Sequence, residues 1–172
     1  MLDEASITSG RLGRPSVGEA VQDGLVPGST AYVAQPPWTD NCSIRDNIVF
    51  GFSFEQERYE GVLKACALNQ DFEFLADGDA TIAGAGGSSL SGGQKWRVAL
   101  ARALYSLGEI VILEDVLGAV DTPIASWICS HALTGDVAAG RTVILATHRP
   151  EFCIEAARYV VTVENGTAVG NS

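Results

Sequence analysis

The sequence predicts an α/β fold, in which a parallel sheet carries an inserted and mostly helical stretch. After about residue 107, apolar strand-like runs alternate with helical patterns, which is the order typical of a parallel sheet. Residues from about 42 to 106 carry helical patterns almost throughout. At 172 residues the chain has the length of one ordinary domain or of a large piece of one. We therefore assign residues 30–41 and 107–172 to the α/β part and residues 42–106 to a helical subdomain.

The first half of the chain opens with a stretch, up to about Ser29, that is rich in Gly, Pro and Ser and predicts a loop with at most a short strand. The run "TAYVAQ" then predicts a brief strand that ends at Gln35. Helices are predicted over residues 43–50 and 54–68. The second of these repeats large side chains at helical spacing, at Tyr59, Val62, Leu63 and Cys66. A short helix or turn, "DFEFLADGDA", and a glycine-rich loop, "TIAGAGGSS", follow.

The second half begins with a long helix from Gln94 to about Leu107, because neither Gly nor Pro interrupts this stretch. The apolar runs "EIVILED" and "RTVILATH" predict strands that are buried on both faces. Between them, "TPIASWICSHAL" predicts a helix with Pro123 in its first turn. The chain then predicts a short helix, "PEFCIEAA", and a hairpin, "RYVVTVENGTAV", that turns at Asn165-Gly166.

Composition narrows the classes of function. The formal net charge of −10 argues against a module that binds nucleic acid or a membrane surface through bulk positive charge. The four cysteines contain no CxxC pair, so we expect free thiols in a reducing compartment. No apolar run approaches the roughly 20 residues that a membrane span needs, and the acidic start does not have the pattern of a signal peptide. These features predict a chain that is itself soluble and cytosolic.

The segment Ser91-Gly92-Gly93-Gln94 stands directly before the long helix. Ser91 is a favoured N-cap residue, and the first turn of a helix presents unpaired N–H groups and the positive end of the helix dipole. Two glycines allow an anion to approach the backbone, and Gln94 can add an amide donor. The segment therefore predicts a phosphate seat, although its residues also suit an ordinary capped helix start.

Polar side chains follow the ends of three predicted strands. Glu114 and Asp115 end one apolar run, His148 ends the next, and Gln35 ends the first strand. Ligands of open α/β sheets bind at the carboxyl edge of the strands, where two carboxylates suit the binding of Mg²⁺ and the polarisation of an attacking water. Solvated acids and a structural histidine remain the alternative at this level. Asp121, before Thr122-Pro123, is a candidate N-cap.

These segments resemble a known family. "LSGGQ" followed by "KWRVALARAL" resembles the signature motif of ABC ATPases, the nucleotide-binding domains of ABC transporters. The stretch from Ala31 to Gly51 is similar to the glutamine-loop segment of the first nucleotide-binding domain in the multidrug-resistance-associated (C) subfamily. "GDATIAGAGGSSLSGGQ", "VILEDVLGAVD" and "VILATH" resemble the loop before the signature, the Walker B strand with its D-loop, and the switch-histidine strand. The resemblance covers about Ala31 to Val169 in the family's order.

This resemblance implies a P-loop NTPase-like ABC ATPase domain that uses ATP and Mg²⁺ and couples them to solute export. It implies that residues Ser91, Gly92, Gly93 and Gln94 contact ATP held by a second nucleotide-binding domain, which associates head to tail. Asp115, His148 and Gln35 would be catalytic, Glu114 and Gln35 would hold Mg²⁺, and Asp121 would lie in the D-loop that reaches the partner domain. Transmembrane domains of the same transporter would be the other partners, at the cytosolic face of a membrane.

The sequence also departs from the family pattern. A Walker A motif requires G-x4-G-K-[ST], whereas the two lysines, Lys64 and Lys95, do not follow glycine. We therefore expect the domain to be incomplete at its N-terminus, beginning after that loop. Glu114 precedes Asp115 where the family has Asp followed by Asp or Glu, "DVLGAVD" replaces the usual "DPLSAVD", and Trp96 replaces a smaller or polar residue.

These departures leave alternatives for the isolated chain. The first is a fragment of an exporter domain that binds ATP weakly and hardly hydrolyses it, so its status as an enzyme stays open. The second is a non-catalytic truncated remnant or interaction module. A soluble ATPase of the DNA-repair type is disfavoured by the "NIVFG" segment and by the absence of coiled-coil heptads. Without a central strand, exposed sheet edges would also make the chain poorly soluble or partly unfolded.

Overall fold

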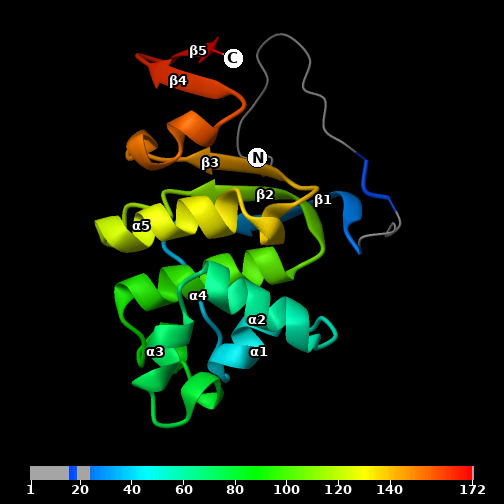
Figure 1. Ribbon diagram of the computed structural model, residues 1–172, viewed down its shortest axis with the longest axis vertical. Coiled ribbons are helices and arrows are strands. Elements are labelled where there is room, and N and C mark those ends of the chain that lie inside the picture. Colours follow the sequence, from blue (N-terminus) through cyan, green and yellow to red (C-terminus); the bar gives the residue numbers. More distant parts are fainter. Residues whose placement is uncertain (1–15, 19–23, 172) are drawn as a thin grey trace.

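The computed structural model describes residues 16–18 and 24–171. It contains a three-stranded parallel sheet in the order β1-β2-β3 and a separate antiparallel hairpin, β4–β5 (Figure 1). The strands are β1 (Val26–Val33), β2 (Gly108–Glu114), β3 (Thr142–Ala146), β4 (Val160–Glu164) and β5 (Thr167–Asn171). The parallel sheet agrees with the predicted α/β class.

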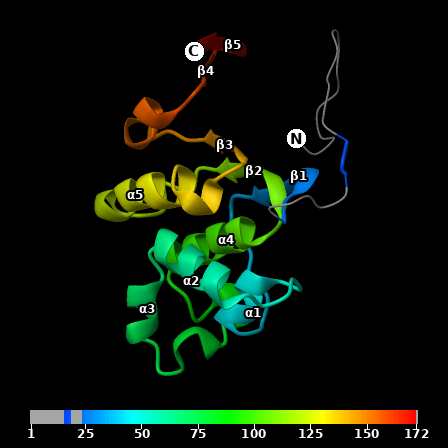
Figure 2. The ribbon, with the colours of Figure 1, turned by 45° about the vertical axis from the view of Figure 1, so that its right-hand side comes forward.

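Five α-helices lie among the described residues, on one side of the sheet. They are α1 (Ile44–Val49), α2 (Gln56–Ala65), α3 (Asn69–Glu73), α4 (Gly92–Tyr105) and α5 (Thr122–Ile128), and α5 continues as a π-helical turn over Cys129–Leu133. Helix α4 lies between the sheet and the smaller helices, because it contacts β1 and β2 on one side and α1 and α2 on the other (Figure 2). None of the helices in the described ranges combines the length and the apolar character needed to cross a bilayer.

The hydrophobic core is built around α4. Its apolar residues recur at helical spacing, so that Val98, Leu100, Ala101 and Leu104 are almost fully buried. Tyr105, at the end of the helix, is also fully buried and donates its O–H to the Ser53 carbonyl over 2.7 Å. The burial of these side chains ties the sheet and the helical stretch into one core.

Among the described elements, helices cover only one face of the sheet, which corrects the prediction that its strands are buried on both faces. The row Val33–Leu113–Leu145 crosses the sheet on the helix side, and the first two of these residues are buried. The neighbouring row Tyr32–Ile112–Ile144 faces the other way, and Tyr32 and Ile144 are 41% and 51% exposed. Side chains alternate between the two faces of a strand, so the apolar run is continuous in sequence although only alternate residues are buried.

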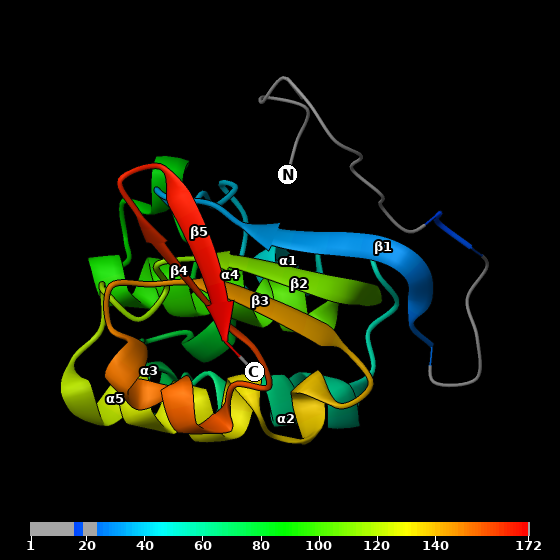
Figure 3. The ribbon, with the colours of Figure 1, turned by 90° about the horizontal axis from the view of Figure 1, so that it is seen from above.

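The hairpin β4–β5 lies on the side of the sheet opposite the helices (Figure 3). It turns at Asn165-Gly166, as predicted, and both residues have positive φ angles. Three of its valines, Val161, Val163 and Val169, are exposed. The outer face of the sheet and this hairpin therefore present apolar side chains that no other described element buries.

Several predicted boundaries differ from the structure. Strand β1 begins at Val26, within the stretch for which a loop with at most a short strand was predicted, and it ends at Val33 rather than at Gln35. It pairs with β2 from Val26, and the Glu109 carboxylate accepts the Gly28 N–H over 2.6 Å. Helix α4 begins at Gly92, two residues earlier than predicted. The short helix predicted over 150–157 is instead two 3₁₀ turns, Pro150–Phe152 and Ile154–Ala156. Such boundaries depend on long-range pairing and caps, which periodicity does not report.

Candidate functional site

The predicted phosphate seat is the N-terminus of α4. Ser91 is the N-cap, and its Oγ accepts the Gln94 N–H over 3.2 Å while Gln94 Oε1 accepts the Ser91 N–H over 2.8 Å. This reciprocal pair is a capping box, and it satisfies two of the backbone donors at the start of the helix. The N–H groups of Gly92 and Gly93 have no partner within a helix at these positions, so they are the donors available to an anion.

The two glycines of this segment have different surroundings. Among the described residues, a Cβ at Gly92 would meet no atom within 4 Å, so no other segment packs against this position. A Cβ at Gly93 would lie 3.5 Å from the Ala119 carbonyl oxygen, which places the signature start beside the turn that follows β2. The predicted signature and D-loop segments are therefore neighbours in this fold.

Gln94 was predicted to offer an amide donor, but both ends of its side-chain amide have partners. Oε1 accepts from Ser91, and Nε2 donates to Asp71 Oδ1 over 3.0 Å. The side chain therefore stabilises the start of the helix and is not a free donor for an anion. Anion binding here rests on the backbone of the two glycines.

The second group of predicted site residues gathers at the carboxyl edge of the sheet. Because β1, β2 and β3 are parallel, their ends bring Gln35, Glu114, Asp115 and His148 to one edge. Glu114 Oε2 accepts the Tyr32 O–H over 2.7 Å and the Gln35 N–H over 3.3 Å. The Gln35 side chain itself is exposed. Tyr32 was not predicted as a site residue, and the signal for it was its position on the strand next to Glu114.

Asp115 and His148 form a direct contact at the same edge. His148 Nε2 lies 3.1 Å from Asp115 Oδ2, and the His148 side chain is 84% exposed. Asp115 has a φ of 50°, which is uncommon for a residue other than glycine, and its N–H donates to the Ala146 carbonyl over 2.8 Å. A neighbouring strand thus holds the aspartate in its left-handed conformation.

Gly118 lies directly against the side chain of Asp115. A Cβ at Gly118 would lie 2.5 Å from Asp115 Oδ2, which is closer than real Cβ contacts allow. The glycine in "DVLGAVD", noted above as a departure from the usual serine, therefore makes room for this carboxylate. The residue type alone gave no sign of this contact.

The turn between β2 and α5 contains the predicted D-loop residue Asp121. Asp121 is the N-cap of α5, since its Oδ1 accepts the Ile124 N–H over 2.9 Å. Arg149, which the sequence analysis missed, anchors the same turn by donating to the Leu117 and Val120 carbonyls, each over 2.9 Å. Arg149 directly follows His148, so the end of β3 supports both the histidine and this turn.

Two carboxylates, Glu114 and Asp115, lie at the carboxyl edge, where Glu114 and Gln35 are the candidate magnesium ligands. Asp115 Oδ1 is buried and has no hydrogen-bond partner, and Glu114 uses only one of its oxygens in the bonds given above. No group of three potential metal ligands occurs among the described residues. Mg²⁺ is often held by one or two carboxylates together with substrate phosphates and water, and this donor set suits that arrangement.

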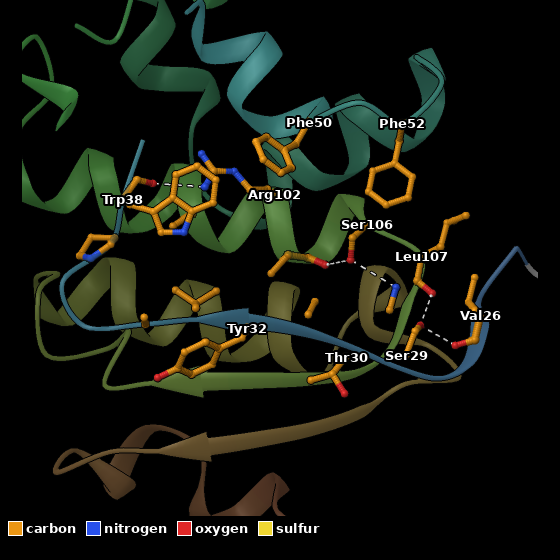
Figure 4. Close-up of a pocket in the computed structure, with 17 residues that line it drawn as sticks. Val26, Ser29, Thr30, Tyr32, Trp38, Phe50, Phe52, Arg102, Ser106 and Leu107 are labelled. Atoms are coloured by element: carbon orange, nitrogen blue, oxygen red, sulfur yellow. Dashed lines mark hydrogen bonds between the residues drawn. The ribbon is translucent and has the colours of Figure 1, made fainter. Parts of the chain in front are cut away.

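A groove lies between β1, the C-terminal half of α4 and the segment that follows α1. It has a volume of about 370 Å³, and the aromatic residues Trp38, Phe50 and Phe52 line one wall (Figure 4). The Trp38 and Phe50 rings meet edge to face, with centroids 5.2 Å apart. All three aromatic residues are more than a third exposed, so the groove presents apolar surface outwards.

Arg102 of α4 forms the base of this groove. Its guanidinium carbon lies 3.8 Å from the Trp38 ring centroid, and its nitrogens donate to the Trp38 carbonyl over 3.2 Å and to the Asn47 carbonyl over 2.6 Å. Burial lowers the Arg102 pKa to about 10. Asn47 is fully buried and accepts the Asp40 N–H over 2.8 Å. The segment after Gln35 is therefore fastened to α4 and α1.

The parallel sheet with carboxylates at its carboxyl edge, and the capped, glycine-containing start of α4, are compatible with a fragment of an α/β ABC ATPase. Comparison with known proteins agrees. No protein-family model matches the chain. The chain is 41% identical over 170 residues to the pleiotropic ABC efflux transporter of multiple drugs of Candida glabrata, and this match covers 96% of the chain and 10% of that transporter.

Other relatives are of the same kind. The chain is 40% identical over 172 residues to ABC transporter 7 of Pyricularia oryzae, with 96% of the chain and 10% of that protein covered. It is 40% identical over 165 residues to the ATP-binding cassette transporter abc4 of Schizosaccharomyces pombe, with 96% and 11% covered. The chain is therefore homologous to a segment of ABC transporters, and it spans about a tenth of the length of these relatives.

Proposed function

We propose that this chain is part of a nucleotide-binding domain of an ABC exporter of the C subfamily, which couples ATP binding and hydrolysis to the transport of a solute. In this proposal the N-terminus of α4 binds the γ-phosphate of an ATP molecule held by a second nucleotide-binding domain. The observation that carries the proposal is the open, capped start of α4. It is supported by the identity of about 40% to ABC transporters over nearly the whole chain.

The geometry of the signature segment suits an anion that comes from outside the chain. Ser91 and Gln94 satisfy one another, so the helix start is capped without a ligand. The open backbone at Gly92 and the positive end of the α4 dipole then favour a phosphate. Because the sequence holds no G-x4-G-K-[ST] motif, we assign the cradle of that phosphate to another part of the protein.

Helix α4 links this phosphate seat to the aromatic groove. Its 14 residues give it a length of about 20 Å. Ser91 caps one end, while Arg102, near the other end, fastens the segment after Gln35. A shift of α4 on ATP binding would therefore move the wall of the groove that contains Arg102. We assign the groove to the transmembrane domains of the same transporter, because nine-tenths of the length of the relatives lies outside the matched segment.

Asp115, His148 and Gln35 are the proposed catalytic residues. When bound, Mg²⁺ would neutralise phosphate charge, and Glu114 and Gln35 are the residues that would hold it. Asp115 would orient and polarise the attacking water, and His148 would reach the phosphate from the end of β3. In the structure, His148 Nε2 contacts the Asp115 carboxylate over 3.1 Å.

A specific observation also favours the alternative of a non-catalytic remnant. The Glu114 carboxylate accepts bonds from Tyr32 and Gln35, and Asp115 contacts His148, so both carboxylates have partners within the chain. Such a chain would keep the signature segment and have little hydrolytic activity.

The proposal is tested in a chimera. Residues of the Candida glabrata relative that match this chain are replaced by this sequence, and ATP-dependent drug efflux is measured in cells that lack the native transporter. We expect efflux in the chimera and its loss on Gly92→Asp, because a carboxylate would then occupy the phosphate seat. Aspartate in the first turn of a helix is otherwise favourable, so this variant should fold normally.

Gln56→Asp is the matched control, because it places the same carboxylate in the first turn of α2, an exposed helix start that is not part of the proposed phosphate seat. It should keep most of the efflux. Efflux that survives Gly92→Asp would overturn the assignment of the phosphate seat. A chimera that reaches the membrane without any efflux, while the parent transporter is active in the same cells, would favour the remnant.

A further inference from the structure

Asp71 of α3 connects two side chains on the first turns of α4. Its Oδ1 accepts from Gln94 Nε2 over 3.0 Å and from Arg97 over 3.1 Å, and its Oδ2 accepts a further bond from the Arg97 guanidinium. Arg97 also donates to the Ala67 carbonyl and, over 3.3 Å, to the Gly93 carbonyl. Asp71 and Arg97 are only 18% and 12% exposed. Charge-assisted hydrogen bonds of this kind are stronger than neutral ones.

The contacts determine the orientation of the Gln94 amide. A carboxylate only accepts hydrogen bonds, so the NH₂ group must face Asp71. The amide oxygen is then directed to the Ser91 N–H, which it accepts over 2.8 Å. If the amide were reversed, its oxygen would oppose the carboxylate and the capping box would be broken. Asp71 therefore acts on the start of α4 through Gln94.

The same arrangement neutralises Arg97. The guanidinium lies one turn from the glycines and would attract an anion if it were free, but its charge is paired with Asp71. Two opposite effects of Asp71 on anion binding are thus separable. Positioning of the helix start strengthens binding, whereas neutralisation of Arg97 weakens it.

We propose that Asp71 is a positioning residue for the phosphate seat: through Gln94 and Arg97 it holds the α4 N-terminus so that the Gly92 and Gly93 N–H groups stay directed at an incoming phosphate. This inference rests on the proposed function for the identity of the anion. It assigns the orientation of the seat to a residue about 20 positions earlier, on a different helix.

The test uses the isotope-labelled 172-residue chain, with inorganic tripolyphosphate as the probe and the amide resonances of Gly92 and Gly93 as the readout. In the wild type both resonances should shift in a saturable way. Asp71→Ala should weaken the affinity about tenfold, the effect of losing one or two charge-assisted hydrogen bonds. Glu73→Ala is the matched control, because it removes an acid from the exposed face of the same helix, and it should stay within about twofold of the wild type.

A reciprocal pair of variants separates positioning from charge. Gln94→Glu keeps an acceptor for the Ser91 N–H but sets a carboxylate against Asp71, so it should weaken tripolyphosphate binding by more than Asp71→Ala does. Adding Asp71→Asn restores the wild-type net charge and supplies an NH₂ donor to the introduced carboxylate. This double variant should recover affinity to within about threefold of the wild type, since the hydrogen bond is restored with its direction reversed.

The sign of the Asp71→Ala effect decides the matter. Tighter binding of tripolyphosphate would mean that Asp71 acts only by neutralising Arg97, and it would overturn the inference. An unchanged affinity would overturn it as well. If the wild type shows no shift at either glycine, the proposed phosphate function fails, and amide exchange then tests the positioning separately. Exchange at Gly92–Gln94 should become about tenfold faster in Asp71→Ala, and unchanged exchange would refute positioning.

Discussion

The N-terminus of α4 and the carboxyl edge of the sheet are built in different ways. The start of α4 is capped by Ser91 and held by the ion pair between Asp71 and Arg97. The rest of the helix has a buried inner face. The carboxyl edge has an exposed His148, an Asp115 with a positive φ angle and an unpartnered buried oxygen, and strands with one uncovered face. The first region is complete within this chain, and the second has groups that other atoms could still satisfy.

This difference agrees with the different roles that we propose for the two regions. A phosphate seat that contacts a nucleotide held by another domain needs only its own backbone N–H groups and the side chains that position them. A site that holds its own nucleotide needs a phosphate loop, and no such motif occurs in this sequence.

We expect the largest effect on stability from a substitution in the hydrophobic core beneath the two regions. Leu104→Ala on α4 should lower the free energy of unfolding by about 2–5 kcal/mol, because its side chain is 1% exposed and its removal leaves a cavity. Ile144→Ala on β3 should cost less than about 1 kcal/mol, because half of that side chain is already in solvent. Urea unfolding followed by circular dichroism measures both, and equal costs would contradict a one-sided core.

The glycines of the two regions should respond in opposite directions. Gly118→Ser should cost about 1–3 kcal/mol, because the new Cβ would overlap Asp115 Oδ2. Gly92→Ala should be neutral or stabilising by up to about 1 kcal/mol, since its Cβ has room and alanine favours a helix. Thermal unfolding of the two variants checks the contrast. A harmless Gly118→Ser would show that Asp115 is free to move.

The helix caps at the two regions should contribute similar, smaller amounts. Ser91→Ala and Asp121→Ala each remove a side-chain acceptor from a helix start, and each should lower stability by about 1 kcal/mol. Ser91→Ala should also speed amide exchange at Gln94, whose N–H loses its acceptor. If Ser91→Ala had no effect on stability or exchange, the capping box would not contribute to the rigidity of the phosphate seat.

The smallest effect is a dependence on alkaline pH. Burial, with the nearby Cys153 thiol as a lesser cause, raises the Cys129 pKa from 9.0 to about 11. Between these values the folded chain keeps the thiol proton and the unfolded chain releases it, so rising pH lowers the free energy of unfolding. Urea unfolding at pH 8 and pH 10 should therefore show a decline. Cys129→Ala should decline less, and an identical slope would contradict the shifted pKa.

The elements with strong local patterns could be predicted from the sequence. The alternation of apolar runs and helical patterns predicted the parallel sheet, and Asn165-Gly166 predicted the hairpin turn. The predicted groups also came together, because parallel strands must end at one edge, which brought Gln35, Glu114 and His148 side by side. Ser91 and Asp121 are N-caps, as their residue types suggested. In each case the cause is local or follows directly from the sheet.

Features that depend on distant partners could not be predicted. The apolar run "VILED" is compatible with a strand that is buried on one face or on both. The row Tyr32–Ile112–Ile144 faces away from the helices because of where the helices pack, which the run does not indicate. The side chain of Gln94 is engaged because α3 places Asp71 beside it. Gly118 is needed only because Asp115 folds back towards it. Spacing along the chain carries no signal for such contacts.

The class of fold, the order of the elements and the segments that carry the candidate chemistry followed from the amino-acid sequence, because short-range patterns and helix and turn chemistry are encoded locally. Only the tertiary structure decided which of those side chains are free to act. It engaged Gln94 and paired Arg97 with Asp71, and it left the backbone of Gly92 open. The physical reason is that hydrogen-bond partners and burial are set by elements that meet only when the chain has folded.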